Sequence, residues 1–177
     1  MKNSIEYKLI AKHYGDRVAL RSQVPLMNHI NEGLVVLDRI SATDQAKRAF
    51  CLHPLLQADE DLKENCYLVS FVEPHVLVLT MEYRNIANAY LSDKIDTDWP
   101  LQLSPLSEVN EMLIADKVQN RKDFITYHYG THERSDELAR YFNKWLNALD
   151  INADTYVRLC RAIDESKEMK NENVYLY

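Results

Sequence analysis

The chain has 177 residues, which suffice for one domain with a substantial core but hardly for two. Its apolar content of 46% is ordinary for a globular protein, and only three glycines and five prolines argue against an all-β architecture rich in tight turns. A net charge of −6 without any basic run disfavours a long nucleic-acid partner, but it leaves room for a small phosphorylated ligand.

Apolar residues at helical spacing predict three helices in the first third of the chain: residues 4–14, 25–40 and 43–53. We expect Ser4 to cap the first helix, with Ile5 on its inward face. Pro25 suits the first turn of the second helix. The third helix is expected to end at His53, because a residue before a proline such as Pro54 is pushed out of the α region.

The rest of the chain predicts four more helices: 74–91, 104–124, 135–149 and 153–168. Residues 57–65 are expected to form an acidic, exposed linker, and residues 67–72 can form a short strand. We expect 92–103 to be a polar connection and the tail from residue 170 to be loose or docked. The sequence therefore predicts an all-α, single-domain bundle of about seven helices, with residues 1–177 in one domain.

The cysteines and the hydropathy pattern bear on the compartment. Cys51, Cys66 and Cys160 are odd in number and lack the spacing of a metal finger, so we interpret them as reduced thiols of a cytoplasmic protein. The charged N-terminal segment lacks the apolar stretch of a signal peptide. The longest apolar run is too short to cross a bilayer, so we expect no membrane partner.

Three polar residues fall on the apolar faces of three different predicted helices: His29, His53 and Asp116. A single inward histidine is usually a hydrogen-bonded core residue, and an inward aspartate can simply pair with an arginine. Three such positions in one small domain weaken those explanations. Imidazole and carboxylate together are ligands for a divalent ion such as Mn, Fe or Zn.

Four stretches resemble a known family. SQVPLMNH, ending at His29, is similar to the SGEPYxxH motif of the RelA/SpoT-type (p)ppGpp hydrolase domain, a branch of the HD metal-dependent phosphohydrolases. CLHPLLQADEDL (51–62) lies where that family has LHDxxED, and IADKVQNRKDF (114–124) resembles its LADKLxNLRDL. SDELARYFNKWLNAL resembles its closing helix. The resemblance covers residues 5–149 and leaves 150–177 as a C-terminal helix and tail.

The resemblance implies an HD-like helical domain with one divalent ion, commonly Mn²⁺ and otherwise Fe or Zn, held by His29, His53 and Asp116. It places Asn120 beside the metal or the ribose-phosphate of a substrate. It also implies supporting basic residues: Lys117 and Lys122 on the phosphate side or stabilising the loop, and Arg21 near a base-contacting position.

The sequence also departs from the family. Pro54 stands where the defining aspartate is expected, and Gln57 with Ala58 replaces the Glu-Asp pair that activates the attacking water. Gln57 thus occupies a catalytic position, and the following Asp59 and Glu60 either supply the missing carboxylate or form a solvated face. Arg84 either contacts a phosphate or pairs with Glu82 or Asp116.

These observations favour a metal-dependent phosphohydrolase that acts on a nucleotide, similar to the small stand-alone (p)ppGpp hydrolases. The first alternative is a catalytically inactive HD-like domain that binds a nucleotide or a protein partner. A further alternative is a helical interaction protein in which the histidines and the aspartate only satisfy one another. The last helix and tail can serve as a homo-oligomer contact or cover the site.

Overall fold

The computed structural model describes residues 1–91 and 100–174, apart from the side chains of Val69 and of residues 168–174. In this part of the chain the helices are α1 (Ile5–Tyr14), α2 (Met27–Arg39), α3 (Asp44–Leu56), α4 (Asp59–Asn65), the 3₁₀ helix η1 (Cys66–Ser70), α5 (Pro74–Ala89), α6 (Ser107–Tyr127), α7 (Ser135–Ala148) and α8 (Ala153–Val174). The all-α prediction is confirmed, and α4 is the helix that the sequence analysis missed.

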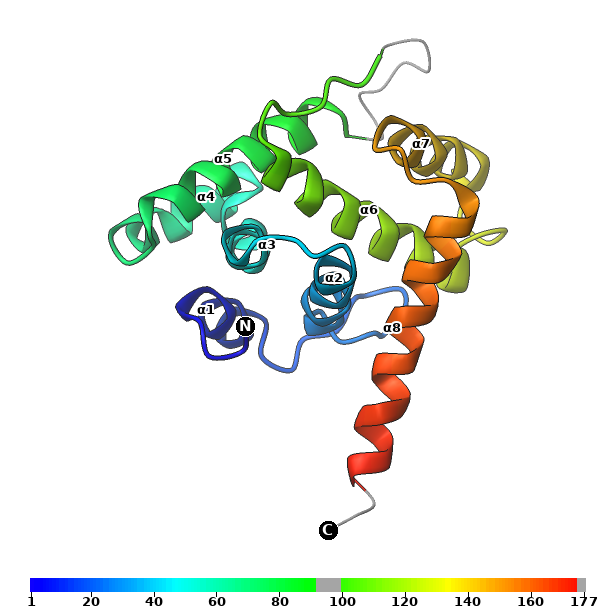
Figure 1. The fold of residues 1–177 in the computed structure, drawn as a ribbon, viewed down its shortest axis with the longest axis horizontal. Helices are drawn as coiled ribbons and strands as arrows, with labels where there is room; N and C mark the ends of the chain where they lie inside the picture. The colour runs from blue at the N-terminus through cyan, green and yellow to red at the C-terminus, as the bar shows by residue number, and fades with distance from the viewer. Residues whose placement is uncertain (92–99, 175–177) are drawn as a thin grey trace.

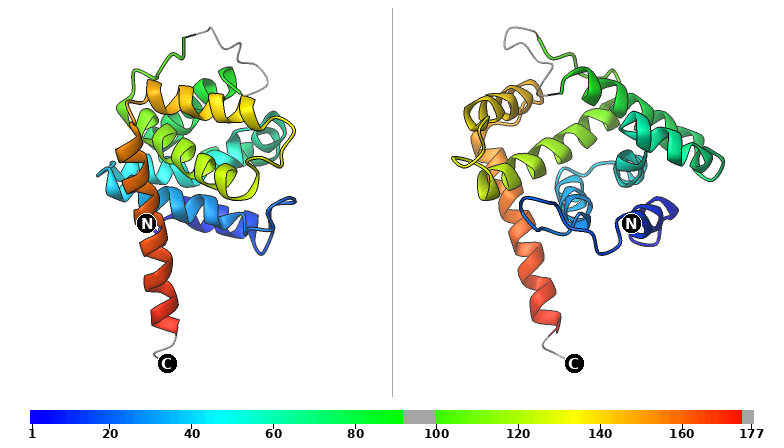
Figure 2. Two further views of the ribbon diagram at one scale, coloured as in Figure 1. Left: turned by 90° about the vertical axis from the view of Figure 1, so that its right-hand side faces the viewer. Right: turned by 180° about the vertical axis from the view of Figure 1, so that it is seen from behind.

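Helix α6 crosses the middle of the molecule and organises the bundle (Figure 1). It packs against α2, α3, α5, α7 and α8, while α1 covers α3 from the outer side. The two further views show α8 running along one side of the bundle toward the C-terminus (Figure 2). Fully buried apolar side chains from α3, α5, α6 and α7 fill the centre: Phe50, Leu52, Leu55, Leu79, Met112, Leu113 and Trp145.

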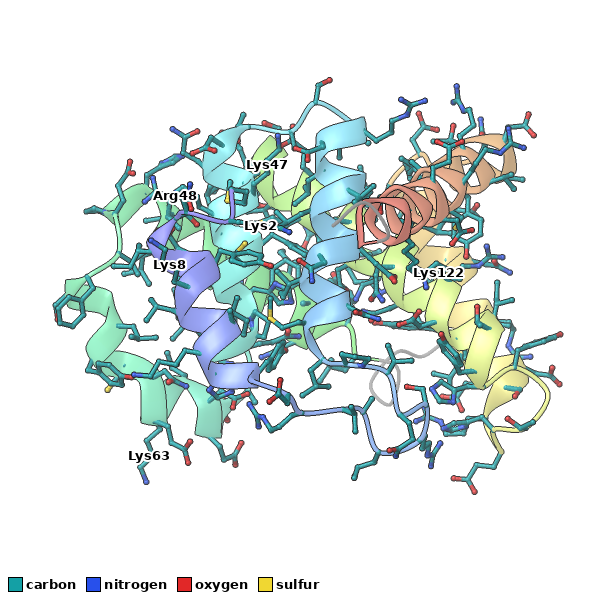
Figure 3. All side chains as sticks on the ribbon, turned by 90° about the horizontal axis from the view of Figure 1, so that it is seen from below. Lys2, Lys8, Lys47, Arg48, Lys63 and Lys122 are labelled. Carbon is teal, nitrogen blue, oxygen red and sulfur yellow. The ribbon has the colours of Figure 1, made fainter. Side chains whose placement is uncertain are left out.

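Helix α1 begins as predicted, since the Ser4 hydroxyl accepts a hydrogen bond from the Tyr7 amide. Its inward face is rotated in part from the expected one: Ile10 is fully buried, but Ile5 is exposed and Glu6 is fully buried. The cause is Arg48 of α3, whose guanidinium donates to both Glu6 carboxylate oxygens, at 2.8 and 3.2 Å, and to Glu73 at 2.6 Å. Figure 3 shows Arg48 on α3 beside α1. One guanidinium thus joins α1, α3 and the start of α5.

The prediction that α3 ends before Pro54 is wrong, because the helix continues through this proline to Leu56. A proline lacks the N–H that would donate to the carbonyl of Phe50, four residues earlier. The Nδ1 atom of His53 lies 2.6 Å from that carbonyl oxygen and replaces the lost donor. The proline costs little here since the helix ends two residues later.

The segment predicted as a linker is helix α4, and the predicted strand is the 3₁₀ helix η1. Asp59, Glu60 and Asp61 occupy the first turn of α4, where acidic side chains stabilise the positive end of the helix dipole. The same acidic run that looked like a solvated linker is therefore a helix start. The apolar residues of η1 meet no partner strand in the described chain, and strand propensity alone does not form a sheet.

The ends of several other helices also differ from their predicted positions. Pro25 pairs with Val18 in an isolated bridge, and α2 begins two residues later at Met27. Helix α6 begins at Ser107, because the Ser104 hydroxyl accepts from the Leu106 amide in a turn that precedes the helix. The Asn152 side chain accepts from the Thr155 amide and caps α8, which extends to Val174. Residues 92–99 of the predicted connection and 175–177 of the tail lie outside the described residues.

Within the described chain, no helix combines the length and the apolar character that crossing a bilayer requires.

Candidate metal centre

The fold brings together the three polar residues that the sequence analysis singled out. His29 lies in the first turn of α2, His53 near the end of α3, and Asp116 in the middle of α6. One nitrogen or oxygen atom of each lies within 4.8 Å of those of the other two. His53 and Asp116 are buried, and His29 is partly exposed toward a cleft. The cluster could hold a metal ion, and the identity of that ion stays a prediction.

Each imidazole is held through its Nδ1 atom. His53 Nδ1 lies 2.6 Å from the Phe50 carbonyl oxygen, and His29 Nδ1 lies 2.7 Å from Oε1 of Gln119. Both partners are oxygen acceptors, so each Nδ1 carries the proton of the neutral ring. The Nε2 atoms of both rings are therefore left with lone pairs.

The geometry of these lone pairs suits a cation. The two Nε2 atoms lie 3.3 Å apart, and Asp116 Oδ1 lies 3.7 Å from Nε2 of His29. Acceptor atoms with lone pairs repel each other at 3.3 or 3.7 Å unless a proton or a cation lies between them. Ligands bound about 2.1 Å from one tetrahedral ion lie about 3.4 Å apart. The two distances from Nε2 of His29 are close to this value, and all three atoms lie within 4.8 Å of one another. Hydrogen bonding of the outer ring nitrogen to an oxygen is typical of histidine metal ligands.

The charges around Asp116 keep it ionised. Lys117 Nζ lies 2.8 Å from Asp116 Oδ2 and 3.2 Å from the Tyr141 hydroxyl, and the Asn120 amide donates to Asp116 Oδ1 at 2.8 Å. Burial alone raises the pKa of the Asp116 carboxyl, but the adjacent charge of Lys117 outweighs burial and lowers the pKa to about 2. The carboxylate is thus an anionic ligand at any moderate pH.

His53 is kept neutral. Its burial, followed by repulsion from His29, lowers the pKa of His53 to about 3. The ring of Tyr83 lies 4.7 Å from that of His53, and burial raises the pKa of the Tyr83 hydroxyl well above 10. Neutral imidazole is the form that coordinates a metal.

The cluster lies in a cleft of about 430 Å³ between the loop 15–26, α3 and α6. Among the residues predicted for catalysis or substrate binding, Gln57, Lys117 and Asn120 line this cleft. Asp123, one turn beyond Asn120, also lines it and was not predicted. Ser22 and Tyr141 line the cleft as well.

The remaining predicted residues lie elsewhere. Asp59, Glu60 and Arg84 line a neighbouring cleft of about 650 Å³ that shares Pro54 and Gln57 with the first. Arg84 donates to the Gln57 carbonyl and to the Asp59 carboxylate, so its contacts hold the end of α3 and the start of α4.

Two further basic residues also lie outside the metal cleft. Arg21 lines a third cavity beside His128 and His132. Lys122 forms an ion pair with Glu32 at 3.0 Å.

The sequence analysis missed Gln119 and Tyr141. Gln119 lies three residues after Asp116, on the helix face that meets α2, and this spacing was visible in the sequence. Tyr141 is on a different helix, and its contact with Lys117 has no local signature.

Comparisons of the chain with family models, with curated proteins and with solved structures find no match.

Proposed function

We propose that this protein is a metal-dependent phosphohydrolase that acts on a nucleotide, with His29, His53 and Asp116 as the metal ligands. The observation that carries the proposal is the convergence of two imidazole Nε2 acceptors and one ionised carboxylate at the floor of a cleft. The resemblance of the motifs around these three residues to HD-type hydrolases points to the same chemistry.

The chain's own residues define what the site does. Three protein ligands leave coordination positions open toward the cleft. A bound divalent ion would polarise a phosphoryl oxygen and lower the pKa of a bound water. Lys117 balances the charge of Asp116 from the side away from the imidazoles, and the amide of Asn120 restrains the same carboxylate. Asn120, Ser22 and Tyr141 offer hydrogen bonds to a phosphorylated ligand in the cleft.

The second candidate is an inactive HD-like domain that binds its nucleotide or a protein partner without turnover. Two observations favour it. Pro54 and Gln57 line the cleft where the resembled family has acidic side chains. The nearby carboxylates are engaged elsewhere, because Asp59 pairs with Arg84 and Asp123 accepts from the Gln119 amide at 2.7 Å. Neither is poised to take a proton from a water at the cluster.

The first experiment measures metal content by elemental mass spectrometry on native protein and after incubation with Mn²⁺, Fe²⁺ or Zn²⁺. Asp116→Asn keeps the shape of the side chain, and Asp116→Ala removes it. Asp164→Ala, at an exposed position of α8, is the matched control. We expect about one ion per chain in the native protein and the control, and loss of that ion in both Asp116 variants.

A panel of nucleotide phosphoesters is then tested for hydrolysis. Turnover that requires the ion and Asp116 supports the enzyme. Stoichiometric metal and nucleotide-induced thermal stabilisation without turnover supports the binding domain. No metal in the native protein, even with excess Mn²⁺, overturns the metal-dependent function.

A further inference from the structure

Gln119 connects the candidate metal centre to a buried network of charges. Its Oε1 atom lies 2.7 Å from Nδ1 of His29, and its Nε2 atom donates to Asp123 at 2.7 Å and to Glu32 at 3.3 Å. The Gln119 side chain is 1% exposed and Glu32 is 4% exposed. At this degree of burial, water cannot replace the protein groups that hydrogen-bond to the amide.

The carboxylates decide which way the amide points. Ionised carboxylates only accept hydrogen bonds, so the NH₂ group of Gln119 must face Glu32 and Asp123. Its carbonyl oxygen then faces His29, and that oxygen can only accept. Nδ1 of His29 must therefore donate, which leaves the lone pair on Nε2, the atom that faces His53 and Asp116.

Glu32 is itself held in its ionised form. Lys122 of α6 lies 3.0 Å from Glu32 Oε2, and Lys167 of α8 lies 2.8 Å from Oε1. Burial alone raises the pKa of the Glu32 carboxyl, but the hydrogen bonds from Lys167 and Lys122 outweigh burial and lower it. Figure 3 shows Lys122 between α2 and α8. Helices α2, α6 and α8 thus meet at the carboxylate that orients Gln119.

We propose that Gln119 is a positioning residue of the metal centre: its amide oxygen holds His29 as the Nδ1–H tautomer, and Glu32 sets the orientation of that amide. This inference rests on the proposed function, since it assigns the group that prepares one of the three ligands. Outer hydrogen-bond partners of this kind contribute 10- to 100-fold to metal affinity.

The test uses Gln119→Met, which keeps the length of the side chain and removes both the acceptor that faces His29 and the donor that faces Glu32 and Asp123. Gln119→Leu provides a second apolar variant of different shape. Gln45→Met is the matched control, at a position about 12 Å from His53 along the axis of α3. Zn²⁺ and Mn²⁺ affinities are measured by competition with a chelator, and circular dichroism verifies folding.

The second measurement is the side-chain ¹⁵N spectrum of the histidines in the metal-free protein, with the His29 signals assigned from His29→Asn. In the wild-type protein we expect the Nδ1–H tautomer for His29. In Gln119→Met we expect a mixture of tautomers and metal affinity lower by about 10- to 100-fold. Gln45→Met should change neither.

The outcomes separate the two proposals. Wild-type protein that binds no metal contradicts the proposed function, whatever the ¹⁵N spectrum shows. Wild-type protein that binds metal, together with folded Gln119→Met and Gln119→Leu that bind it equally well, overturns the role of Gln119 alone. An Nε2–H tautomer for His29 in the wild-type protein also overturns that role.

Discussion

Gly33 ties the packing of the core to the geometry of the metal cluster, and Gly33→Ala tests that connection. Gly33 lies on α2 one turn after His29, and a Cβ atom at this position would overlap the ring of Phe50. Phe50 is fully buried, with ring centroids 5.5 Å from His29 and 4.8 Å from His53. The ring therefore cannot move without displacing a candidate ligand.

The magnitude follows from two opposing effects. Alanine in a helix interior is favoured over glycine by about 1 kcal/mol. Overpacking a rigid core costs about 1–3 kcal/mol, and the overlap with a fully buried ring points to the upper end. We expect a net loss of about 2 kcal/mol, which corresponds to a fall of about 4–8 °C in Tm for a chain of this size.

The assay is urea unfolding followed by fluorescence and circular dichroism. Phe50→Leu makes room beside Gly33, so the double variant should be more stable than the sum of the single effects allows. A Gly33→Ala variant that is about 1 kcal/mol more stable than the wild type would refute the close contact, because helix propensity alone would then account for the change.

Three further predictions address charge and ligand orientation. Lys117→Met leaves the Asp116 carboxylate buried without its partner, so we expect a loss of about 3–5 kcal/mol in urea unfolding; an unchanged stability contradicts the buried ion pair. The folded-state pKa of Glu32 is lowered, so its stabilisation is present above the ordinary value of 4.5 and is lost as the pH falls through the lowered pKa. Glu32→Gln should therefore flatten the unfolding free energy against pH in the acid range, and an identical acid dependence speaks against this ion network. Pro54→Ala restores a backbone N–H that competes with Nδ1 of His53 for the Phe50 carbonyl, so we expect a folded protein with weaker metal binding in chelator competition. Equal or tighter binding would contradict the proposed orientation of His53.

Much of the fold could be predicted because the spacing of apolar residues is a local property. Helices α2, α3 and α7 carry clear apolar faces. His29, His53 and Asp116 stand at core-facing positions of α2, α3 and α6, and that placement together with the family resemblance predicted that they meet. Each of those inferences needs only the spacing of side chains along one helix and the assumption that all the helices pack around one core.

The failures come from contacts between distant residues. The rotation of α1 depends on Arg48, which lies 42 residues from Glu6, and nothing near Ile5 indicates it. The orientation of His29 depends on Gln119, 90 residues away. Pro54 was interpreted by its usual effect on a helix, and the donor that compensates for it is a side chain whose direction the sequence does not reveal.

The proline in α3 also constrains how this site can change by mutation. The resembled family places an aspartate at the position of Pro54, so a single substitution would seem to supply a fourth ligand. Such a residue also brings a backbone N–H that points at the Phe50 carbonyl, the acceptor that now orients His53. The effect of an aspartate at position 54 is therefore coupled to the hydrogen bond that orients His53, because both involve the Phe50 carbonyl. A return to four ligands would place two donors, the new backbone N–H and Nδ1 of His53, on the one carbonyl oxygen of Phe50.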